Sequence, residues 1–269
     1  MRELTGRVGV VTGAARGIGR GTAEAMAAAG MRVVLADLDA DRLAATVADL
    51  QAEGAEAIGI PTDVTDPAAV QALADAAVAA YGTVHVAVNN AGICTLGLSW
   101  QTELDDWQRV FDVNLYGVVH GVRAFMPILL ANPDGGHIAN VASMGGMLIG
   151  PMIAPYTASK AAVIALSKSL RAETALSGAD VGVTVVCPGN ITTEMADHLI
   201  TAGELPPQGV AMRQALQKGN ANGIPAREAG GIILDAVRDN RFWALPNGAA
   251  QFPLVEQSHE ELRASFGSD

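Results

Sequence analysis

Short apolar runs alternate with longer alanine-rich stretches along most of this chain of 269 residues. The runs are apolar throughout, without the alternation of apolar and polar residues that marks a strand with one face in water. The stretches between them have the length and composition of helices. Strands buried on both faces and separated by helices form a parallel sheet with helices on either side. We therefore predict a doubly wound α/β fold with about seven strands.

The boundaries of the predicted elements follow from the turn and capping residues between these stretches. We expect strands at residues 8–11, 32–36, 55–61, 84–88, 137–141, 181–187 and 241–245. We expect helices at residues 18–29, 41–52, 67–80, 105–130 and 155–177, with one more before the last strand. No low-complexity linker divides the chain, so we interpret residues 1–269 as a single domain. The least regular part, at about residues 191–224, is interpreted as a lid or loop insertion over a substrate.

A glycine-rich turn at residues 12–19 joins the first predicted strand to the first predicted helix. Glycines at such a junction permit a tight turn, let the backbone approach a pyrophosphate and allow the helix to pack closely on the sheet. The helix N-terminus then presents free N–H groups to the phosphates. The turn predicts a dinucleotide site and a Rossmann-like fold, the alternative being a glycine-rich connection that binds nothing. The contacts expected from it are Gly13, Arg16, Gly17, Ile18 and Gly19.

Asp37 ends the second predicted strand, where an adenosine ribose is expected. Its carboxylate can accept hydrogen bonds from the 2′ and 3′ hydroxyls of NAD and would repel the 2′-phosphate of NADP. The next residue, Leu38, offers no compensating charge. We therefore predict NAD as the cofactor, with NADP, bound through the basic Arg16, as the open alternative.

The composition excludes several other kinds of site and partner. The 17 Lys and Arg against 28 Asp and Glu give a net charge of −11, without a basic cluster, so nucleic acid is not an expected partner. Cys94 and Cys187 make no disulfide or metal spacing and are interpreted as buried in a reducing compartment. The five histidines are scattered, so no metal site is predicted. With no signal-peptide core at the start and no apolar run of bilayer length, we expect a cytoplasmic protein without membrane contact.

Tyr156 and Lys160 are four residues apart in a predicted helix, so both side chains lie on the same face. An ammonium beside a phenol favours the phenolate and is expected to lower the pKa of the tyrosine from about 10. Such a pair can act as a general acid/base. Ser143 follows the fifth predicted strand and precedes Tyr156 by thirteen residues.

Taken in register, these motifs resemble the short-chain dehydrogenase/reductase family in its shorter single-domain form, from Arg7 to about Thr193. The resemblance adds cofactor contacts on three segments, namely the adenine side, the stretch Asn89–Gly92 after the fourth strand, and the nicotinamide side. Taken alone, Asn89 and Asn90 could equally satisfy strand-end backbone groups, and Asn114 could be a buried polar helix residue. The implied contacts are Asp63, Val64, Asn90, Ala91, Gly92, Tyr156, Lys160, Pro188, Gly189, Ile191 and Thr193.

The resemblance also implies catalytic roles for four side chains. Tyr156 would move the hydroxyl proton during hydride transfer between the nicotinamide and a carbinol carbon. Lys160 would lower the pKa of the tyrosine and bind the nicotinamide ribose. Ser143 would donate a hydrogen bond to the substrate oxygen. Asn114 would hold a water molecule that links Lys160 to solvent.

The substrate is predicted from the segment after Ser143, residues 144–153, which is apolar and rich in methionine. It suits an apolar or neutral secondary alcohol or ketone, although the same residues could pack in the core or against a second subunit. Met195 and Leu199 in the lid could close over the same pocket. The only basic side chains placed for an anionic substrate are Arg213 and Lys218 in the lid.

The C-terminal part departs from the commonest pattern of the family. Many members end in a strand and a glycine-rich tail that builds one tetramer interface, whereas this chain ends in an acidic tail at residues 256–269. We expect a homodimer or homotetramer, with the helices at 105–130 and 155–177 pairing two subunits.

Three alternative functions remain open from the sequence. The first is an NADP-dependent carbonyl reductase on the same fold. The second is a non-catalytic NAD-binding sensor, a kind of protein that typically lacks the tyrosine or the lysine. The third is a dehydratase or epimerase of the extended branch, which usually has a different glycine spacing and a longer substrate domain.

Overall fold

A parallel sheet forms the centre of the computed structural model, which describes residues 3–201 and 204–266. The strands of the sheet are β1 (Val8–Thr12), β2 (Arg32–Asp37), β3 (Ala57–Pro61), β4 (Val86–Asn89), β6 (Gly136–Val141), β7 (Val181–Val186) and β11 (Trp243–Ala244). Their order is β11–β7–β6–β4–β1–β2–β3, and every neighbouring pair is parallel. Each predicted strand is present, with ends shifted by at most two residues. The doubly wound, Rossmann-like fold is confirmed.

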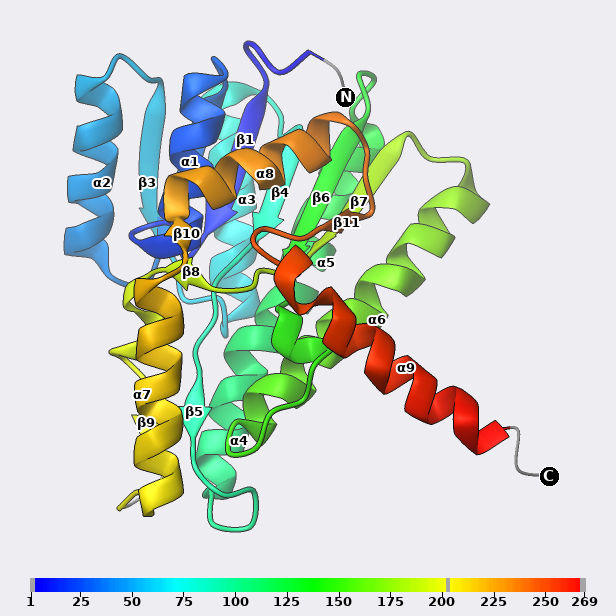
Figure 1. The fold of residues 1–269 in the computed structure, drawn as a ribbon. Coiled ribbons are helices and arrows are strands. Elements are labelled where there is room, and N and C mark those ends of the chain that lie inside the picture. Colours follow the sequence, from blue (N-terminus) through cyan, green and yellow to red (C-terminus); the bar gives the residue numbers. More distant parts are fainter. Residues whose placement is uncertain (1–2, 202–203, 267–269) are drawn as a thin grey trace.

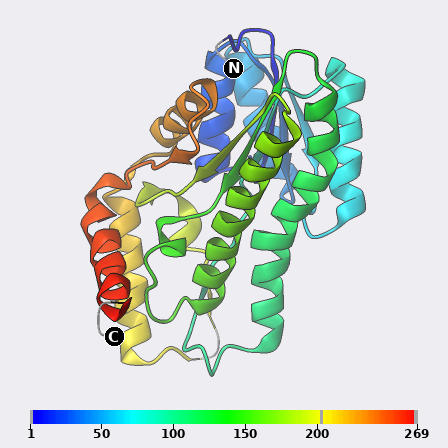
Figure 2. The same ribbon diagram turned by 90° about the vertical axis from the view of Figure 1, so that its right-hand side faces the viewer.

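Helices cover both faces of the sheet (Figure 1 and Figure 2). One face carries α1 (Gly17–Ala28), α2 (Ala40–Ala52) and α8 (Ala226–Arg238), whose apolar residues share a core with the sheet. The other face carries α3 (Pro67–Tyr81), α5 (Gly117–Ala131) and α6 (Ala154–Ser177). The inner strands are largely apolar because both of their faces are buried in these two cores, whereas the edge strands β3 and β11 have exposed residues.

The order of the strands reverses next to β1, which pairs with β2 on one side and with β4 on the other. Loops that leave neighbouring strands at such a point turn towards opposite faces and leave a crevice at the carboxyl ends of the strands. The glycine-rich turn, the loop after β4 and the loop after β6 all start at this edge. The topology therefore places the predicted site residues of all three loops at one end of the sheet.

The predicted helix at residues 105–130 is interrupted. Helix α4 (Leu104–Phe111) continues into a π-helical turn at Asp112–Tyr116 and then into α5. Such wide turns occur frequently at functional sites, and this one contains Asn114. The combined stretch Leu104–Ala131 does have the length and hydropathy of a membrane span, contrary to our expectation, but α5 packs on β4, β6 and α3 as a core helix does.

The region at residues 191–224 is more regular than predicted. It contains β8 (Ile191–Thr192), a 3₁₀ turn at Glu194–Ala196, β9 (Ile200–Thr201) and the helix α7 (Pro207–Ala221), while residues 202–203 lie outside the described part. Two small parallel sheets hold it: β8 pairs with β10 (Ile224–Pro225), and β9 pairs with β5 (Thr95–Leu96). The sequence did not indicate these individual elements, because the short strands are stabilised by partners distant in sequence, and the role of the segment as a lid stays a prediction.

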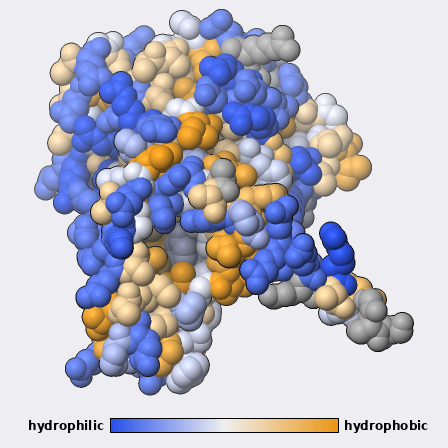
Figure 3. Space-filling model, in the orientation of Figure 1, coloured by the Kyte–Doolittle hydropathy of each residue, from blue (hydrophilic) through white to orange (hydrophobic). Residues whose placement is uncertain are grey.

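The acidic C-terminal tail is a helix over its described part. After β11 the chain forms a 3₁₀ turn at Ala249–Gln251 and the helix α9 (Phe252–Phe266), and residues 267–269 lie outside the described part. Figure 1 shows α9 projecting away from the sheet, and α7 lying beyond the carboxyl ends of the strands. In Figure 3 this face is hollowed beside α7, with hydrophobic side chains gathered around the opening.

Candidate active site

One cavity of about 1100 Å³ at the carboxyl ends of the strands contains most of the predicted site residues. Gly19 and Asn114 are the predicted residues that do not line it. Gly19 packs against Gly13, and Asn114 is fully buried next to the lining residues. The predicted residues that line it are Gly13, Arg16, Gly17, Ile18, Asp37, Asp63, Val64, Asn90, Ala91, Gly92, Ser143, Tyr156, Lys160, Pro188, Gly189, Ile191 and Thr193.

The glycine turn has a backbone that only glycine adopts easily. Gly13 and Gly17 have φ values of +64° and +55°, in the left-handed region where a side chain adds strain. A Cβ at Gly13 would also lie 2.9 Å from the Cα of Ala91, and a Cβ at Gly19 would collide with the carbonyl oxygen of Gly13. Helix α1 begins at Gly17 without a side-chain cap, so its first N–H groups are left for a ligand in the cavity.

Asn90 braces this turn from the end of β4. Its Nδ2 donates hydrogen bonds to the carbonyl oxygens of Thr12 and Gly13, at 2.8 and 3.1 Å. The N–H groups of Asn90 and Ala91 donate in turn to the Oγ1 of Thr12, at 3.0 and 3.2 Å. The structural alternative for Asn90 is therefore realised in the structure, and the side chain forms part of the cavity wall as well.

Asp37 lies at the end of β2 with each carboxylate oxygen held by one backbone group. Oδ2 accepts from the N–H of Ala15 and Oδ1 from the N–H of Asp39, both at 3.0 Å. A carboxylate oxygen has two lone pairs, so each retains acceptor capacity for a hydroxyl group in the cavity. The neighbouring wall is formed by Val64, packed against Gly117, and by Asp63, which accepts two hydrogen bonds from Thr65.

Ser143, Tyr156 and Lys160 meet at the opposite end of the cavity. Ser143 follows β6, and its Oγ accepts from the N–H of Gly145 at 3.0 Å in a 3₁₀ turn (Met144–Gly146). Tyr156 and Lys160 come from the first turns of α6. Tyr156 is half-buried, Lys160 is only 2 % exposed, and the ammonium lies 5.9 Å from the centroid of the Tyr156 ring.

The pKa of Tyr156 shifts in the direction opposite to our expectation. Burial raises it well above its ordinary value, and a hydrogen bond with Ser143 opposes this only in part. Burial also lowers the pKa of Lys160 to about 8. Desolvation is the largest cause of both pKa shifts. The Lys160 ammonium donates its hydrogen bond to a backbone carbonyl and not to the phenol, so it does not offset the effect of burial on Tyr156. The expected lowering of the tyrosine pKa by the lysine is therefore not seen in this structure.

Asn114 is fully buried in the π-helical turn. Its Oδ1 accepts from the N–H of Ile93 at 2.8 Å, and its Nδ2 donates to the carbonyl of Ile93 and the Oγ of Ser159, at 2.9 and 3.0 Å. The side chain thus ties the loop after β4 to α6. A Cβ at Gly92 would lie 3.3 Å from the Nζ of Lys160 and 3.4 Å from the Oδ1 of Asn114, so this glycine separates the two polar groups.

The segment after β7 and residues 191–224, which we propose below as a lid, form the remaining wall. Gly189 approaches the carbonyl of Asn247 closely enough that a Cβ would collide with it. Thr193 lies against Gly17, and its carbonyl and hydroxyl oxygens each accept from the Nδ2 of Asn220 in α7, at 3.3 Å. The lid therefore contacts the glycine turn directly.

Several residues of the cavity wall were missed in the sequence. Cys94 directly follows the segment after β4, so its position was available as a signal, but α7 and the C-terminal part reach the cavity only through the fold. Of the two basic residues considered for an anionic substrate, neither Arg213 nor Lys218 lines the cavity. The further lining residues on these segments are Cys94, Met212, Leu216, Asn220, Gln251 and Leu254.

Known proteins are similar to this chain in sequence and in fold. The sequence profile of the short chain dehydrogenase family matches residues 7–203. The chain is 41 % identical over 256 residues to 1-deoxy-11-beta-hydroxypentalenate dehydrogenase of Streptomyces avermitilis, covering 94 % of this chain and 89 % of the relative. It is 37 % identical over 263 residues to the protein of the same name from Streptomyces exfoliatus, covering 97 % and 90 %.

Solved structures agree with the sequence relatives. A short-chain dehydrogenase/reductase from Burkholderia phymatum, crystallised in complex with NAD, superposes with a TM-score of 0.94 at 40 % identity and covers 98 % of this chain and 97 % of its own. The apo form of LigO from Sphingobium sp. strain SYK-6 gives 0.85 at 31 % identity, covering 100 % and 92 %. This chain therefore belongs to the short-chain dehydrogenase/reductase family of oxidoreductases, which act on CH–OH groups.

Proposed function

We propose that this protein is an NAD-dependent dehydrogenase that interconverts a secondary alcohol and a ketone, with Tyr156 as the acid/base. One observation carries the proposal: Ser143, Tyr156 and Lys160 line the same cavity as the glycine turn and Asp37. A proton-transfer group and a dinucleotide cradle at opposite ends of one cavity are what alcohol oxidation by a nicotinamide requires.

The residues present fit NAD. The positive φ values of Gly13 and Gly17 and the uncapped N-terminus of α1 suit a pyrophosphate. The free acceptor capacity of Asp37 suits the two ribose hydroxyls. NAD, when bound, supplies the acceptor for the hydride. The neighbour from Burkholderia phymatum was crystallised with NAD, which agrees with this choice.

The polar residues then act on the substrate oxygen. Ser143 Oγ, fixed by the N–H of Gly145, donates a hydrogen bond to that oxygen and stabilises the charge that develops on it. Tyr156 takes the hydroxyl proton during oxidation and returns it during reduction. Lys160 orders the nicotinamide ribose and passes the proton onward. Asn114 belongs to the proposed relay through its position beside Gly92 and Lys160.

The substrate end of the cavity favours an apolar or neutral alcohol. Leu148 and Ile153 from the loop after β6 line the cavity together with Met212 and Leu216 from α7. The relatives from Streptomyces are named for dehydrogenation of a hydroxylated substrate, which agrees with the reaction class. We interpret residues 191–224 as the lid over this end and residues 1–269 as one domain.

Two other functions share the same geometry. An NADP-dependent carbonyl reductase would use Arg16, which lines the cavity, to bind the 2′-phosphate. A non-catalytic NAD-binding sensor would bind NAD in the same cavity without turning over a substrate. The reductase is distinguished by comparing activity with the two cofactors, and the sensor by the absence of any turnover that depends on Tyr156.

The test is a spectrophotometric assay of NADH formation from a panel of secondary alcohols, with Tyr156→Phe as the variant and ADP-ribose binding as the second readout. We expect the variant to lose about a thousandfold in turnover and to bind ADP-ribose as the wild type does, because ADP-ribose lacks the nicotinamide beside which Tyr156 is proposed to act. Full activity of Tyr156→Phe would disprove the acid/base role. Binding without turnover on any alcohol would favour the sensor.

We also propose a cytoplasmic homodimer or homotetramer. Trp100, Leu104 and Tyr116 are exposed on or next to α4 and the π-helical turn, with 79, 83 and 48 % of their surface accessible. Large apolar residues exposed along one helical stretch favour an interface. Light scattering after gel filtration should give a mass of two or four chains, and a single-chain mass would contradict the proposal.

A further inference from the structure

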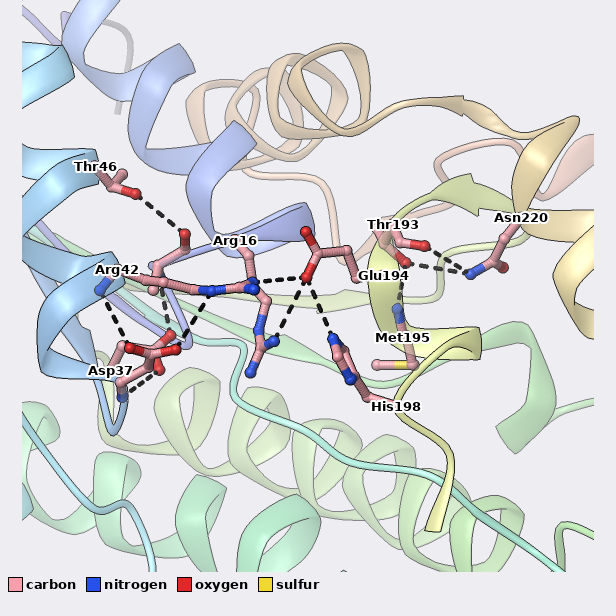
Figure 4. Close-up of polar contacts among 11 residues, drawn as sticks. Arg16, Asp37, Arg42, Thr46, Thr193, Glu194, Met195, His198 and Asn220 are labelled. Carbon is pink, nitrogen blue, oxygen red and sulfur yellow. Dashed lines mark hydrogen bonds and ion pairs between the residues drawn. The ribbon is translucent and has the colours of Figure 1, made fainter. Parts of the chain in front are cut away.

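Glu194, in the segment 191–224, forms ion pairs with Arg16 of the glycine turn and Arg42 of α2 (Figure 4). Glu194 Oε2 accepts a hydrogen bond from Arg42 Nη1 at 2.7 Å and lies 3.6 Å from Arg16 Nη1. His198 Nε2 lies 3.3 Å from the same oxygen. The lid, the glycine turn and α2 therefore meet at one carboxylate.

The acidic groups outnumber the arginines at this point. Arg42 Nε also lies 3.5 Å from Asp39 Oδ2, and the Asp39 N–H donates to Asp37. Asp39 and Glu194 thus both pair with Arg42, and Asp37 adds a third negative charge that acts on the same guanidinium. The hydrogen bond from Arg42 holds the pKa of Glu194 below its ordinary value, so this carboxylate is charged at neutral pH.

A phosphate on the 2′ position of the ribose would need these guanidinium groups. Asp37 marks where the ribose hydroxyls bind under the proposed function, and Arg16 and Glu194 line the same cavity. Arginine binds phosphate through charge-assisted hydrogen bonds from its Nη groups. Glu194 binds the Nη1 group of Arg42 and lies near the Nη1 group of Arg16. It therefore competes with a 2′-phosphate for both arginines.

We propose that Glu194 determines cofactor specificity: it pairs with Arg16 and Arg42 and thereby excludes the 2′-phosphate of NADP. The inference rests on the proposed function, in which the adenosine ribose binds at Asp37. Asp37 alone repels the phosphate, while Glu194 removes the cations that could compensate. Exposed ion pairs of this kind contribute little to folding stability. Their main effect is therefore to lower the positive charge that Arg16 and Arg42 present to a bound ligand.

The experiment is calorimetric titration of the apoprotein with ADP-ribose and with 2′-phospho-ADP-ribose, which requires no turnover. The variant is Glu194→Gln, which keeps the size of the side chain. The matched control is Asp197→Asn, which removes the same charge three residues away, from a side chain that contacts Gln217 and neither arginine. We expect Glu194→Gln to bind 2′-phospho-ADP-ribose about tenfold more tightly, with ADP-ribose affinity changed less than twofold. Asp197→Asn should change both affinities less than twofold.

Adding Arg42→Gln to Glu194→Gln should abolish most of the gain, because the freed guanidinium is its source. An equal change in both ligands for Glu194→Gln would show that Glu194 only holds the lid and would overturn the inference. An equal gain in Asp197→Asn would reduce the effect to net charge and would overturn it as well. Failure of the wild type to bind ADP-ribose would instead refute the proposed function, so the two failures are distinguishable.

Discussion

Lys160 donates a hydrogen bond of 2.8 Å from its Nζ to the carbonyl oxygen of Val141, at the end of β6. The buried lysine is therefore anchored to the sheet, and it holds the start of α6 against the strand that precedes Ser143. Its hydrogen-bonding capacity is only partly used by this contact, because an ammonium has three donors. The remaining donors are available to a ribose and to the proton relay.

The buried Lys160 predicts a pH-dependent stability. Burial lowers its pKa from 10.5 to about 8. Between these two values the unfolded chain retains a proton that the folded chain has released, so the contribution of Lys160 to the free energy of unfolding increases with pH. We expect the difference in that free energy between the wild type and Lys160→Met to change in favour of the wild type by about 2 kcal/mol from about pH 7 to pH 10.

Urea denaturation of the two proteins across this pH range measures the difference. Lys168→Met is the matched control, since Lys168 is exposed on the same helix and the variant keeps the buried lysine. Cys94 and Cys187, whose pKa values burial raises to about 12, change the stability in the opposite sense, and they are common to all three proteins. Parallel pH curves for the wild type and Lys160→Met would contradict the prediction.

Replacing Asn114 should destabilise the fold as well as slow catalysis. Asn114→Ala leaves the N–H and the carbonyl of Ile93 without their hydrogen-bond partner in a partly buried site. We expect a loss of about 2 kcal/mol in the free energy of unfolding, together with a lower kcat. Chemical denaturation and steady-state kinetics on the same preparation check both. A fall in kcat with unchanged stability would indicate a role confined to the proton relay.

Asn90 should matter for cofactor affinity because it braces the glycine turn. In Asn90→Ala the carbonyls of Thr12 and Gly13 lose their donor, and the turn is no longer held in the binding conformation. We expect about a tenfold weaker affinity for ADP-ribose, measured by calorimetry. Asn132→Ala is the control: its Nδ2 also makes two hydrogen bonds, to Thr83 and Val84 near the start of β4, away from the cavity. Equal losses of affinity in both variants would contradict the prediction.

Two adjacent glycines of α8 should respond oppositely to the same substitution. A Cβ at Gly230 would collide with the carbonyl of Gly21 in α1, whereas a Cβ at Gly231 would meet nothing within 4 Å. We expect Gly230→Ala to reduce the free energy of unfolding by about 2 kcal/mol through overpacking. Gly231→Ala should increase it by about 0.5 kcal/mol, since alanine favours the helix. Denaturation curves of both variants check the signs, and equal effects would show that α1 and α8 separate freely.

The strands and the loops at their carboxyl ends could be predicted because their signals are local. The apolar runs are buried on both faces, and the glycines at 13 and 17 adopt the backbone that their residue type allows. The parallel topology then places loops from distant parts of the chain at one edge. For that reason the sequence alone indicates that Ser143, Tyr156 and Asp37 lie near one edge of the sheet.

The elements that were predicted wrongly depend on contacts between distant segments. The π-helical turn around Asn114 has no periodic signature, and it coincides with hydrogen bonds to Ile93, which is 21 residues away. The short strands β8 and β9 of the lid pair with β10 and β5. Each is only two residues long, so the sequence of one strand without its partner does not indicate a strand. The raised pKa of Tyr156 follows from burial, which spacing along a helix does not reveal.

The amino-acid sequence by itself determined the fold class, the dinucleotide-binding turn and the family. It also indicated Tyr156 and Lys160 as the candidate acid/base pair. Each of these inferences depends on residue type and local spacing. The tertiary structure alone decided which groups meet: Lys160 with the carbonyl of Val141, and Glu194 with Arg16 and Arg42. Hydrogen bonds and charge pairs act over a few ångströms, and only the folded chain brings residues that are distant in sequence within that range.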